Sequence, residues 1–336
     1  MEKTEFYKHI KKAVVIPCYR VSAVLRDLIE NIPENIVDHI IVVDDACPNG
    51  AGALAEELKK KDCTVMYHNR NQGVGGAVIS GYRKALDLGC DIIVKLDGDG
   101  QMDPAYMKSL MTPLVHGLAD YAKGNRFTSS DVFKKMPKIR LLGNSILSFL
   151  IKGVSGYWDI MDPTNGYTAV HRRALEKIDL DKVSKGYFFE INMLIDLSIT
   201  DAVVKDVSIP AKYSKEESSL SISKVLVSFP PKLVKGFLKR IFMKYFIYDF
   251  NMASVYIVLG IPLFFLGIFW GIHEWMISIV TGEARSAGTI MLVALPIIIS
   301  FQMLLQAINI DIQKTPRRKW IDMKQERAES IIEVTD

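Results

Sequence analysis

The sequence predicts an α/β domain with a mostly parallel sheet, followed by amphipathic interface helices and a two-helix transmembrane hairpin. Over about the first 125 residues, short β-branched runs alternate with helical stretches, as in parallel sheets that are covered on both faces. Residues 251–310 hold only three charged side chains among 60, which is typical of membrane-spanning segments. The length of 336 residues corresponds to about two domains of roughly 150 residues each.

Charge and cysteine content disfavour several classes of protein. Lys and Arg number 42 against 38 Asp and Glu, a net charge of +4. This is too small to indicate a nucleic-acid partner and too balanced for a disordered chain. The four cysteines form no Cys-x-x-Cys pair, so a zinc site or a disulfide scaffold is disfavoured. The first twelve residues lack an apolar signal segment, so we expect the N-terminal domain to stay in the cytosol.

Four β-branched runs predict strands at Ala13–Ile16, Ile40–Val43, Thr64–Tyr67 and Asp91–Leu96. The stretches between them predict helices at Ser22–Asn31, Ala51–Lys61, Val74–Leu88 and Pro104–His116. In such sheets ligands bind outside the carboxyl ends of the strands. The polar residues expected there are Pro17–Arg20, Asp44–Asp45 and Asp97–Asp99.

Residues 125–210 have a mixed pattern. A basic stretch, Asn125–Arg140, precedes a predicted helix at Leu141–Lys152. The turn-rich segment Asp162–Tyr167, a helix at Gly186–Ile199 and a strand at Ala202–Val207 complete the predicted domain, which we place at residues 1–215.

The region 216–250 is predicted to contain a basic amphipathic helix. Lys224 to Lys244 includes six basic residues and no acidic one, with apolar residues at helical spacing. This pattern indicates a helix at an anionic membrane surface, although an ordinary surface helix of the first domain is an alternative.

Two uncharged runs, Asn251–Ile272 and Ser286–Ile310, are each long enough to span a bilayer. Pro262 and Pro296 are expected to kink these helices without ending them. The loop His273–Ala287 carries a single Lys or Arg, whereas several basic residues flank the outer ends of the pair. The positive-inside rule therefore predicts an integral membrane protein whose N-terminal domain, both termini and tail (residues 311–336) are cytoplasmic.

The strongest local motif lies at Lys95–Pro104. Asp97 and Asp99 flank one glycine at the end of an apolar strand, and Mg²⁺ is commonly held by one or two carboxylates together with substrate phosphates. Gln101 offers a further carbonyl oxygen. A helix cap explains Asp103 but not Asp97 and Asp99, which would repel each other without a cation.

Two further motifs are weaker. Asp44 and Asp45 follow the second predicted strand, where they can accept hydrogen bonds from a base or ribose or cap the next helix. Gly73, Gly75 and Gly76 can offer backbone amides to an anion at a helix start or simply permit close packing. Their spacing and position differ from a dinucleotide-binding fingerprint, so an NAD-dependent enzyme is disfavoured.

Five segments together resemble a known family: VVIPCYR (Val14–Arg20), VVDDACPNG (Val42–Gly50), NRNQGVGGA (Asn69–Ala77), LDGDGQMDP (Leu96–Pro104) and GNRF (Gly124–Phe127). In order and spacing they resemble the inverting GT-A glycosyltransferases of family 2, and more narrowly the polyprenyl-phosphate glycosyltransferases similar to dolichol-phosphate mannose synthase. The resemblance covers about residues 12–210, and a two-span C-terminal anchor is also common in that group.

The resemblance implies a role for each matching residue. It places the nucleotide-sugar site at Pro17, Tyr19, Asp44, Asp45, Gly73, Asp97 and Gly98. It assigns Mg²⁺ or Mn²⁺ on the donor diphosphate to Asp97, Asp99 and Gln101. Asp99 and Arg126 are implied as catalytic residues, with Arg126 meeting the donor or acceptor phosphate. Sugar or acceptor contacts are implied for Asp162, Thr164, Asn165 and Glu190.

The sequence also departs from the family at two points. Arg20-Val21 stands where the family usually has Asn-Glu, which removes one expected contact to the nucleotide. Thr168 stands where an Arg is usual, and Arg172 or Arg173 is a candidate replacement.

The resemblance implies inverting transfer of one sugar from a UDP- or GDP-linked donor to undecaprenyl or dolichyl phosphate in the membrane, with homo-oligomers possible. The alternatives are a family 2 enzyme that extends a glycan, a membrane-tethered nucleotidyltransferase and a non-catalytic membrane scaffold. The absence of a Q-x-x-R-W segment disfavours the first alternative, and the complete Asp97, Asp99 and Gln101 set disfavours the last. The sugar, the nucleotide, the cation and the lipid length are open at this point.

Overall fold

The structure, a computed structural model, describes residues 10–21, 24–33, 35–127, 138–210 and 222–317. It forms two compact units, of which the second is Leu238–Thr315 and the first contains the other described residues. Parts of several predictions lie outside the described residues: the start of the first helix (22–23), most of the basic stretch (128–137), the start of the amphipathic region (216–221) and the tail (318–336).

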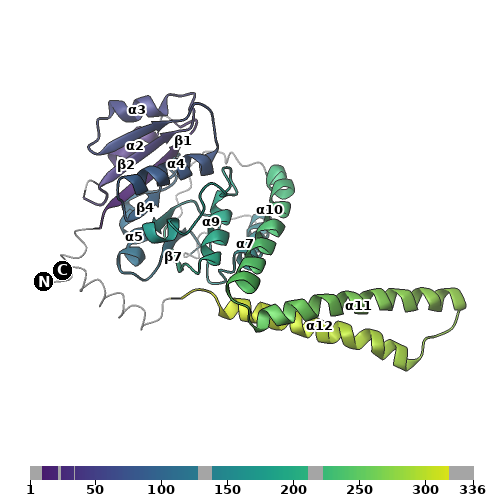
Figure 1. Ribbon diagram of the computed structural model, residues 1–336. Helices are drawn as coiled ribbons and strands as arrows, with labels where there is room; N and C mark the ends of the chain where they lie inside the picture. The colour runs from purple at the N-terminus through teal and green to yellow at the C-terminus, as the bar shows by residue number, and fades with distance from the viewer. Residues whose placement is uncertain (1–9, 22–23, 34, 128–137, 211–221, 318–336) are drawn as a thin grey trace, which may run out of the picture. The chain divides into compact units, whose positions relative to one another are not determined.

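The first unit is built on a seven-stranded sheet with the order β3-β2-β1-β4-β6-β5-β7 (Figure 1). The strands are β1 (Lys12–Cys18), β2 (His39–Asp44), β3 (Cys63–Tyr67), β4 (Ile92–Lys95), β5 (Tyr121–Asn125), β6 (Thr168–His171) and β7 (Val204–Ser208). Neighbours pair in parallel except for β6, which is antiparallel to both β4 and β5. The predicted mostly parallel sheet is confirmed, and each predicted strand lies within two residues of its observed bounds. β5 and β6 were not predicted.

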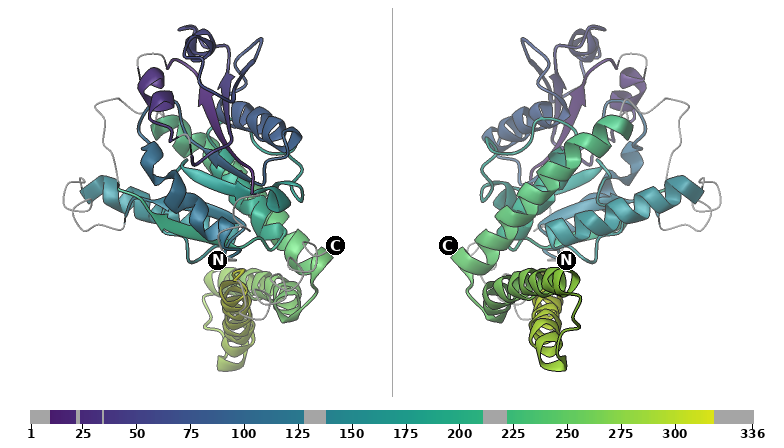
Figure 2. Two further views of the ribbon diagram at one scale, coloured as in Figure 1. Left: turned by 90° about the vertical axis from the view of Figure 1, so that its left-hand side faces the viewer. Right: turned by 90° about the vertical axis from the view of Figure 1, so that its right-hand side faces the viewer.

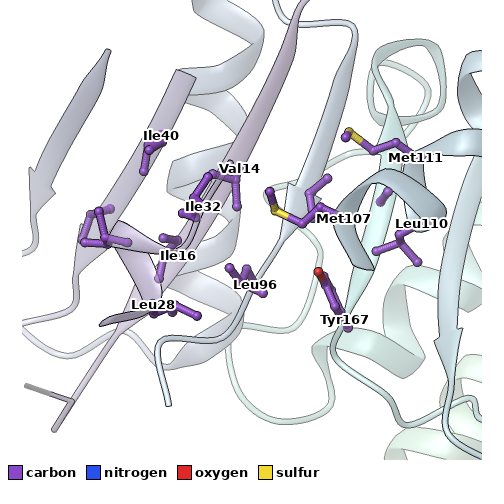
Figure 3. Packing of buried hydrophobic residues seen from close by; sticks show 14 of the residues in the cluster. Val14, Ile16, Leu28, Ile32, Ile40, Leu96, Met107, Leu110, Met111 and Tyr167 are labelled. Atoms are coloured by element: carbon purple, nitrogen blue, oxygen red, sulfur yellow. The ribbon is translucent and has the colours of Figure 1, made fainter. Parts of the chain in front are cut away.

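Helices cover both faces of this sheet (Figure 2). Val14 and Ile16 of β1 pack into one cluster with α2 (Leu25–Glu30), α3 (Ala51–Glu57) and α5 (Met107–Val115). Figure 3 shows members of this cluster, including Leu28, Leu110 and Tyr167. Strand residues alternate between faces, so Val15 points the other way. There α4 (Val74–Asp87) lies against it, with α9 (Phe189–Ile199) beside α4.

The remaining helices of the first unit are η1 (Pro104–Tyr106), α7 (Lys138–Ser155), α8 (Arg172–Leu175) and most of α10 (Ile222–Phe242). Asp103 caps η1, since its Oδ1 accepts a hydrogen bond from Ala105 N at 2.9 Å, as the sequence predicts. Some residues of α10 are packed against other helices, and others are exposed. Phe229 packs on Phe188 and Gly236 lies against Ile195, whereas Val234 and Leu238 are exposed.

The second unit contains a π-helical segment, η2 (Met243–Tyr248), and two long antiparallel helices, α11 (Met252–Thr281) and α12 (Ala287–Gln313), which lie side by side in Figure 1. Both are long and apolar enough to cross a membrane and are largely exposed, which suggests membrane association. Pro262 and Pro296 lie inside helices that continue past them.

The boundary predicted between the two long apolar helices is wrong. The loop predicted at His273–Ala287 is much shorter, because α11 continues to Thr281 and ends at Gly282 in the left-handed conformation (φ 70°). Glu274 lies just beyond the uncharged run predicted to end at Ile272, and within the helix it forms an ion pair with Arg285 at 3.0 Å. A glycine with positive φ is the usual helix terminator, and Gly282 was the better signal.

Close packing of α4 on β1 supplies a test of the fold. A Cβ added at Gly81 would lie 2.3 Å from Val15 Cγ1, and overpacking of this kind costs about 1–3 kcal/mol. We expect Gly81→Ala to lower the thermal unfolding midpoint of the full chain in detergent. Gly143→Ala on α7, where a Cβ meets nothing within 4 Å, is the matched control and should leave the midpoint equal or higher. Equal midpoints for the two variants would contradict the packing of α4 on β1.

Candidate active site

The polar segments predicted to form a site meet at one edge of the sheet. The carboxyl ends of β1, β2, β4 and β5 lie at this edge, as does the amino end of the antiparallel β6. The turn at residues 162–167 leads directly into β6 and therefore belongs to the same edge. Ligands of parallel α/β sheets bind at this edge, so the strand order alone brings the predicted segments together.

Asp97 and Asp99 extend from the end of β4 in a segment that lies against β1. A Cβ at Gly98 would lie 3.2 Å from both Pro17 O and Cys18 Sγ, so this glycine permits a close approach. Asp99 Oδ1 accepts a hydrogen bond from Gln101 N at 2.9 Å, and the Gln101 side chain is exposed. The three side chains predicted to bind a cation, Asp97, Asp99 and Gln101, thus lie on one short loop beside the end of β1.

The side-chain oxygens of these three residues are suitable ligands for a hard divalent cation. The Asp97 side chain is 26% exposed, and carboxylate oxygens are the ligands that Mg²⁺ and Mn²⁺ prefer. Across the described ranges there is no group of three or more His, Cys, Asp or Glu side chains that could hold a metal.

Lys95, the last residue of β4, is a feature of the site that the sequence reasoning missed. Its buried ammonium group lies 2.7 Å from Asp97 Oδ1 and 2.9 Å from Glu190 Oε1, and it donates to Gly166 O at 3.2 Å. A lysine at the end of an otherwise apolar strand was the available signal. Glu190, at the start of α9, is thereby placed at the same edge, and its contact with the sugar or acceptor stays a prediction.

Arg126 and Asp162, which the resemblance places near the phosphates and sugar, are paired with each other. Arg126 Nε and Nη2 donate to the two carboxylate oxygens of Asp162 at 2.7 and 3.0 Å. The Asp162 side chain is fully buried, whereas that of Arg126 is 42% exposed. Such forked pairs are geometrically specific, so Asp162 orients the guanidinium at the edge of the sheet.

Asn165 and Thr164 occupy the turn before β6. Asn165 is buried and joins this turn to β5, because its Nδ2 donates to Gly124 O at 2.7 Å and its Oδ1 accepts from Tyr167 N. The buried Lys123 of β5 donates to Asn165 O. Thr164 is exposed. Tyr19, at the end of β1, is also exposed, and the Arg20 guanidinium lies 5.3 Å from its ring centre.

Asp44 and Asp45 are buried, and their carboxylates accept hydrogen bonds from backbone amides of nearby segments. Asp44 accepts from the amides of Cys47 and Gly52, at 2.6 and 2.7 Å, and so caps the start of α3. Asp45 accepts from Gln72 N and Gly73 N and contacts His68 Nδ1 at 2.7 Å. The helix-capping alternative therefore explains Asp44, and the contacts of both residues with a nucleotide stay predictions.

Gly73, Gly75 and Gly76 allow a close approach between the start of α4 and a distant loop. A Cβ at Gly73 or Gly75 would lie 2.6 Å from Lys185 O or 2.4 Å from Ser184 O, respectively. Gly76 N donates to Lys185 O at 3.0 Å. Close packing therefore accounts for the glycines, although the partner is this loop rather than the sheet, and the predicted anion contact of Gly73 stays a prediction.

Comparison with known proteins identifies the family to which the chain is related. Residues 13–179 match the family described as Glycosyl transferase family 2. The chain is 31% identical over 189 residues to an undecaprenyl-phosphate mannosyltransferase of Micrococcus luteus, covering 53% of this chain and 74% of that protein. It is 29% identical over 188 residues to a UDP-N-acetylglucosamine–dolichyl-phosphate N-acetylglucosaminyltransferase of Methanococcus voltae, covering 52% and 74%.

The fold also has solved counterparts. The crystal structure of glucosyl-3-phosphoglycerate synthase from Mycobacterium tuberculosis, in complex with Mn²⁺, UDP-glucose and phosphoglyceric acid, aligns with a TM-score of 0.51 at 19% identity, over 70% of this chain and 81% of that one. The sheet thus has the GT-A fold. The chain belongs to glycosyl transferase family 2.

Asp206 of β7 holds the two segments that carry the Arg126–Asp162 pair. Its Oδ2 accepts from Asn125 Nδ2 at 3.1 Å and from Met161 N at 2.7 Å, and its Oδ1 is buried without a hydrogen-bond partner among the described residues. Burial raises the pKa of Asp206 to about 6, against the lowering effects of the Met161 amide and Lys123.

This raised pKa predicts a pH dependence of stability. The native carboxyl binds its proton more tightly than the unfolded chain does, so its contribution to stability is present below about pH 4 and is lost as the pH rises through about 6. We expect Asp206→Asn to raise the unfolding midpoint at pH 7.5 and to lose this advantage between pH 6 and 4. Asp87→Asn, at an exposed position on α4, is the control. A gain for Asp206→Asn that is constant from pH 4.5 to 7.5 would contradict the assignment.

Proposed function

We propose that this glycosyltransferase transfers one sugar from a UDP- or GDP-linked donor to a polyprenyl phosphate in the membrane, with inversion at the anomeric carbon. The observation that carries the proposal is the Asp97–Asp99 pair at the ligand-binding edge of the sheet, in a chain that also has two long apolar helices. The relatives from Micrococcus luteus and Methanococcus voltae, whose acceptors are undecaprenyl and dolichyl phosphate by name, support the acceptor class.

A divalent cation is part of the proposal. Asp97 and Asp99, with Gln101 beside them, would hold Mg²⁺ or Mn²⁺ against the donor diphosphate. The cation supplies charge neutralisation for the departing nucleoside diphosphate. The solved relative, which was crystallised with Mn²⁺ and UDP-glucose, supports this choice of cofactor.

The acceptor phosphate is the nucleophile of the proposed reaction. One of its oxygens forms a bond to the anomeric carbon while the bond from that carbon to the donor diphosphate breaks, and the nucleoside diphosphate leaves with the electron pair. The second pKa of a phosphate monoester is about 6, so the nucleophile is largely ionised at neutral pH and needs no base. The exposed side of Arg126, oriented by Asp162, is suited to bind a phosphate.

The domain and membrane assignments belong to the same proposal. We assign the transferase domain to residues 1–215, the interface region to 216–250, the spans to 251–310 and a cytoplasmic tail to 311–336. The basic residues outside the two spans favour the cytoplasmic side for the transferase domain and both termini. This arrangement would present the active site to a lipid headgroup. Association into homo-oligomers is compatible with it.

A donor and acceptor panel tests the proposal. Full-length protein in detergent would be incubated with UDP- and GDP-sugars, undecaprenyl phosphate and Mn²⁺ or Mg²⁺, and the lipid would be analysed by mass spectrometry. We expect a product heavier by one sugar residue, release of nucleoside diphosphate and an anomeric configuration opposite to that of the donor. Release of pyrophosphate would indicate a nucleotidyltransferase instead. Transfer to a glycan but never to the lipid phosphate would indicate the glycan-extending alternative.

Asp99→Asn tests the cation role. The loss of a ligand that contributes several kcal/mol of charge stabilisation should lower kcat/KM about 100-fold or more, with little change in the circular dichroism spectrum. Asp103→Asn makes the same chemical change four residues away, where an asparagine can still cap η1, so it should retain activity. Wild-type turnover by Asp99→Asn, or full activity in excess chelator, would rule out the cation.

A further inference from the structure

Lys95 is a buried charge in the middle of the sheet. Its side chain is 1% exposed, and β4 lies between β1 and β6. A buried ammonium group is strongly unfavourable unless it is paired and hydrogen-bonded. The residue stands two positions before Asp97, so its partners bear directly on the proposed cation site.

The three partners of Lys95 come from three different segments. Its Nζ lies 2.7 Å from Asp97 Oδ1, 2.9 Å from Glu190 Oε1 and 3.2 Å from Gly166 O. Glu190 and Gly166 accept hydrogen bonds from it, whereas Asp97 Oδ1 is held by the ion pair alone and has no hydrogen-bond partner among the described residues. Two of the three partners are carboxylates, so the buried positive charge is paired.

The two carboxylate oxygens of Asp97 have different surroundings. Oδ1 is buried and faces the ammonium group, whereas the side chain as a whole is 26% exposed. Within the described part of the chain, no group donates a hydrogen bond to Oδ2. One oxygen is therefore anchored and the other is available to a ligand.

Gly166 closes the arrangement from the opposite side. A Cβ there would lie 2.6 Å from Lys95 Nζ and 2.8 Å from Asp97 Oδ2. The backbone of the turn before β6 thus lies directly against both charged groups. The position of Asp97 depends on the ammonium group and on the absence of a side chain at residue 166.

We infer that Lys95 is a positioning residue for the cation site, which anchors Asp97 Oδ1 and thereby presents Oδ2 to the divalent cation. The inference rests on the proposed function, because it assumes that Asp97 is a ligand. Groups that orient a metal-binding side chain are typically worth about 10–100-fold in metal affinity.

A change in cation affinity distinguishes positioning from a simple effect of charge. Removing a positive charge next to a cation site strengthens cation binding by Coulomb's law. Removing the anchor of a ligand weakens binding. The two effects have opposite signs, so the direction of the change identifies the role of Lys95.

The test is Mn²⁺ binding by full-length Lys95→Met in detergent. Electron paramagnetic resonance would measure free Mn²⁺ in the presence of UDP and, separately, of GDP. We expect Lys95→Met to bind Mn²⁺ at least about tenfold more weakly than the wild type, with a native circular dichroism spectrum. An equal or tighter affinity in the folded variant overturns the inference.

A second variant covers the case in which Lys95→Met does not fold. Gly166→Ala places a methyl group between Lys95 and Asp97 Oδ2 and should also weaken Mn²⁺ binding about tenfold. Gly143→Ala, at an open position on α7, should bind as the wild type does. Unchanged affinity in Gly166→Ala overturns the inference as well.

The outcomes also separate this inference from the proposed function. If the wild type binds no Mn²⁺ with either nucleotide, the cation site itself is wrong, and the proposed function loses its cofactor. If the wild type binds Mn²⁺ and both variants bind it equally well, the cation site stands and only the role of Lys95 is wrong.

Discussion

The position of the turn before β6 depends on two buried lysines in flanking strands. Lys95 of β4 donates to Gly166 O, and Lys123 of β5 donates to Asn165 O. Because β6 is antiparallel and lies between β4 and β5, the chain must return to the same edge before it enters β6. The two ammonium groups fix the turn there, next to Asp97.

The two lysines differ in their carboxylate neighbours. Lys95 contacts Asp97 and Glu190 directly, and their charges raise its pKa above the usual value despite burial. For Lys123, burial lowers the pKa to about 8, and the raising effects of Glu190 and Asp162 are too weak to offset it. The lysine beside the proposed cation site is therefore the one that the surrounding carboxylates stabilise as an ion.

The strands that could be predicted from the sequence are those with a clear hydrophobic pattern. β1 and β2 are near-continuous apolar runs that are buried on both faces, so their sequences were sufficient. β5 reads YAKGN and β6 reads TAVH. In β5 the buried side chains of Lys123 and Asn125 donate hydrogen bonds to distant segments, and local sequence does not encode such partners.

Only part of the candidate site could be predicted from the sequence. Asp97 and Asp99 stood out, because nothing local explained two acids at a buried strand end. The ion pairs Lys95–Glu190 and Arg126–Asp162 join residues 95 and 36 positions apart, so only the tertiary structure shows that these residues are mutual partners. The glycines at the start of α4 likewise owe their close packing to a loop more than 100 residues away.

The second unit has a buried charge of its own. Asp311 of α12 accepts hydrogen bonds from Arg240 at 2.6 and 3.0 Å and from the Tyr245 hydroxyl at 2.6 Å. Charged groups in or next to membrane spans are costly unless they are paired in this way. Arg240, one of the basic residues that flank the spans, is fully buried, so it stabilises the unit rather than facing an anionic headgroup.

The pairing of the carboxylates at the edge bears on the class of acceptor. A hydroxyl acceptor loses a proton as it attacks, which requires a carboxylate or another base within hydrogen-bond reach. Asp162 is engaged by Arg126, Glu190 by Lys95, and Asp45 by backbone amides and His68. Asp97 and Asp99 are assigned to the cation in the proposed function. In the proposed function the phosphate acceptor arrives largely ionised, so these paired carboxylates can keep their contacts throughout the reaction.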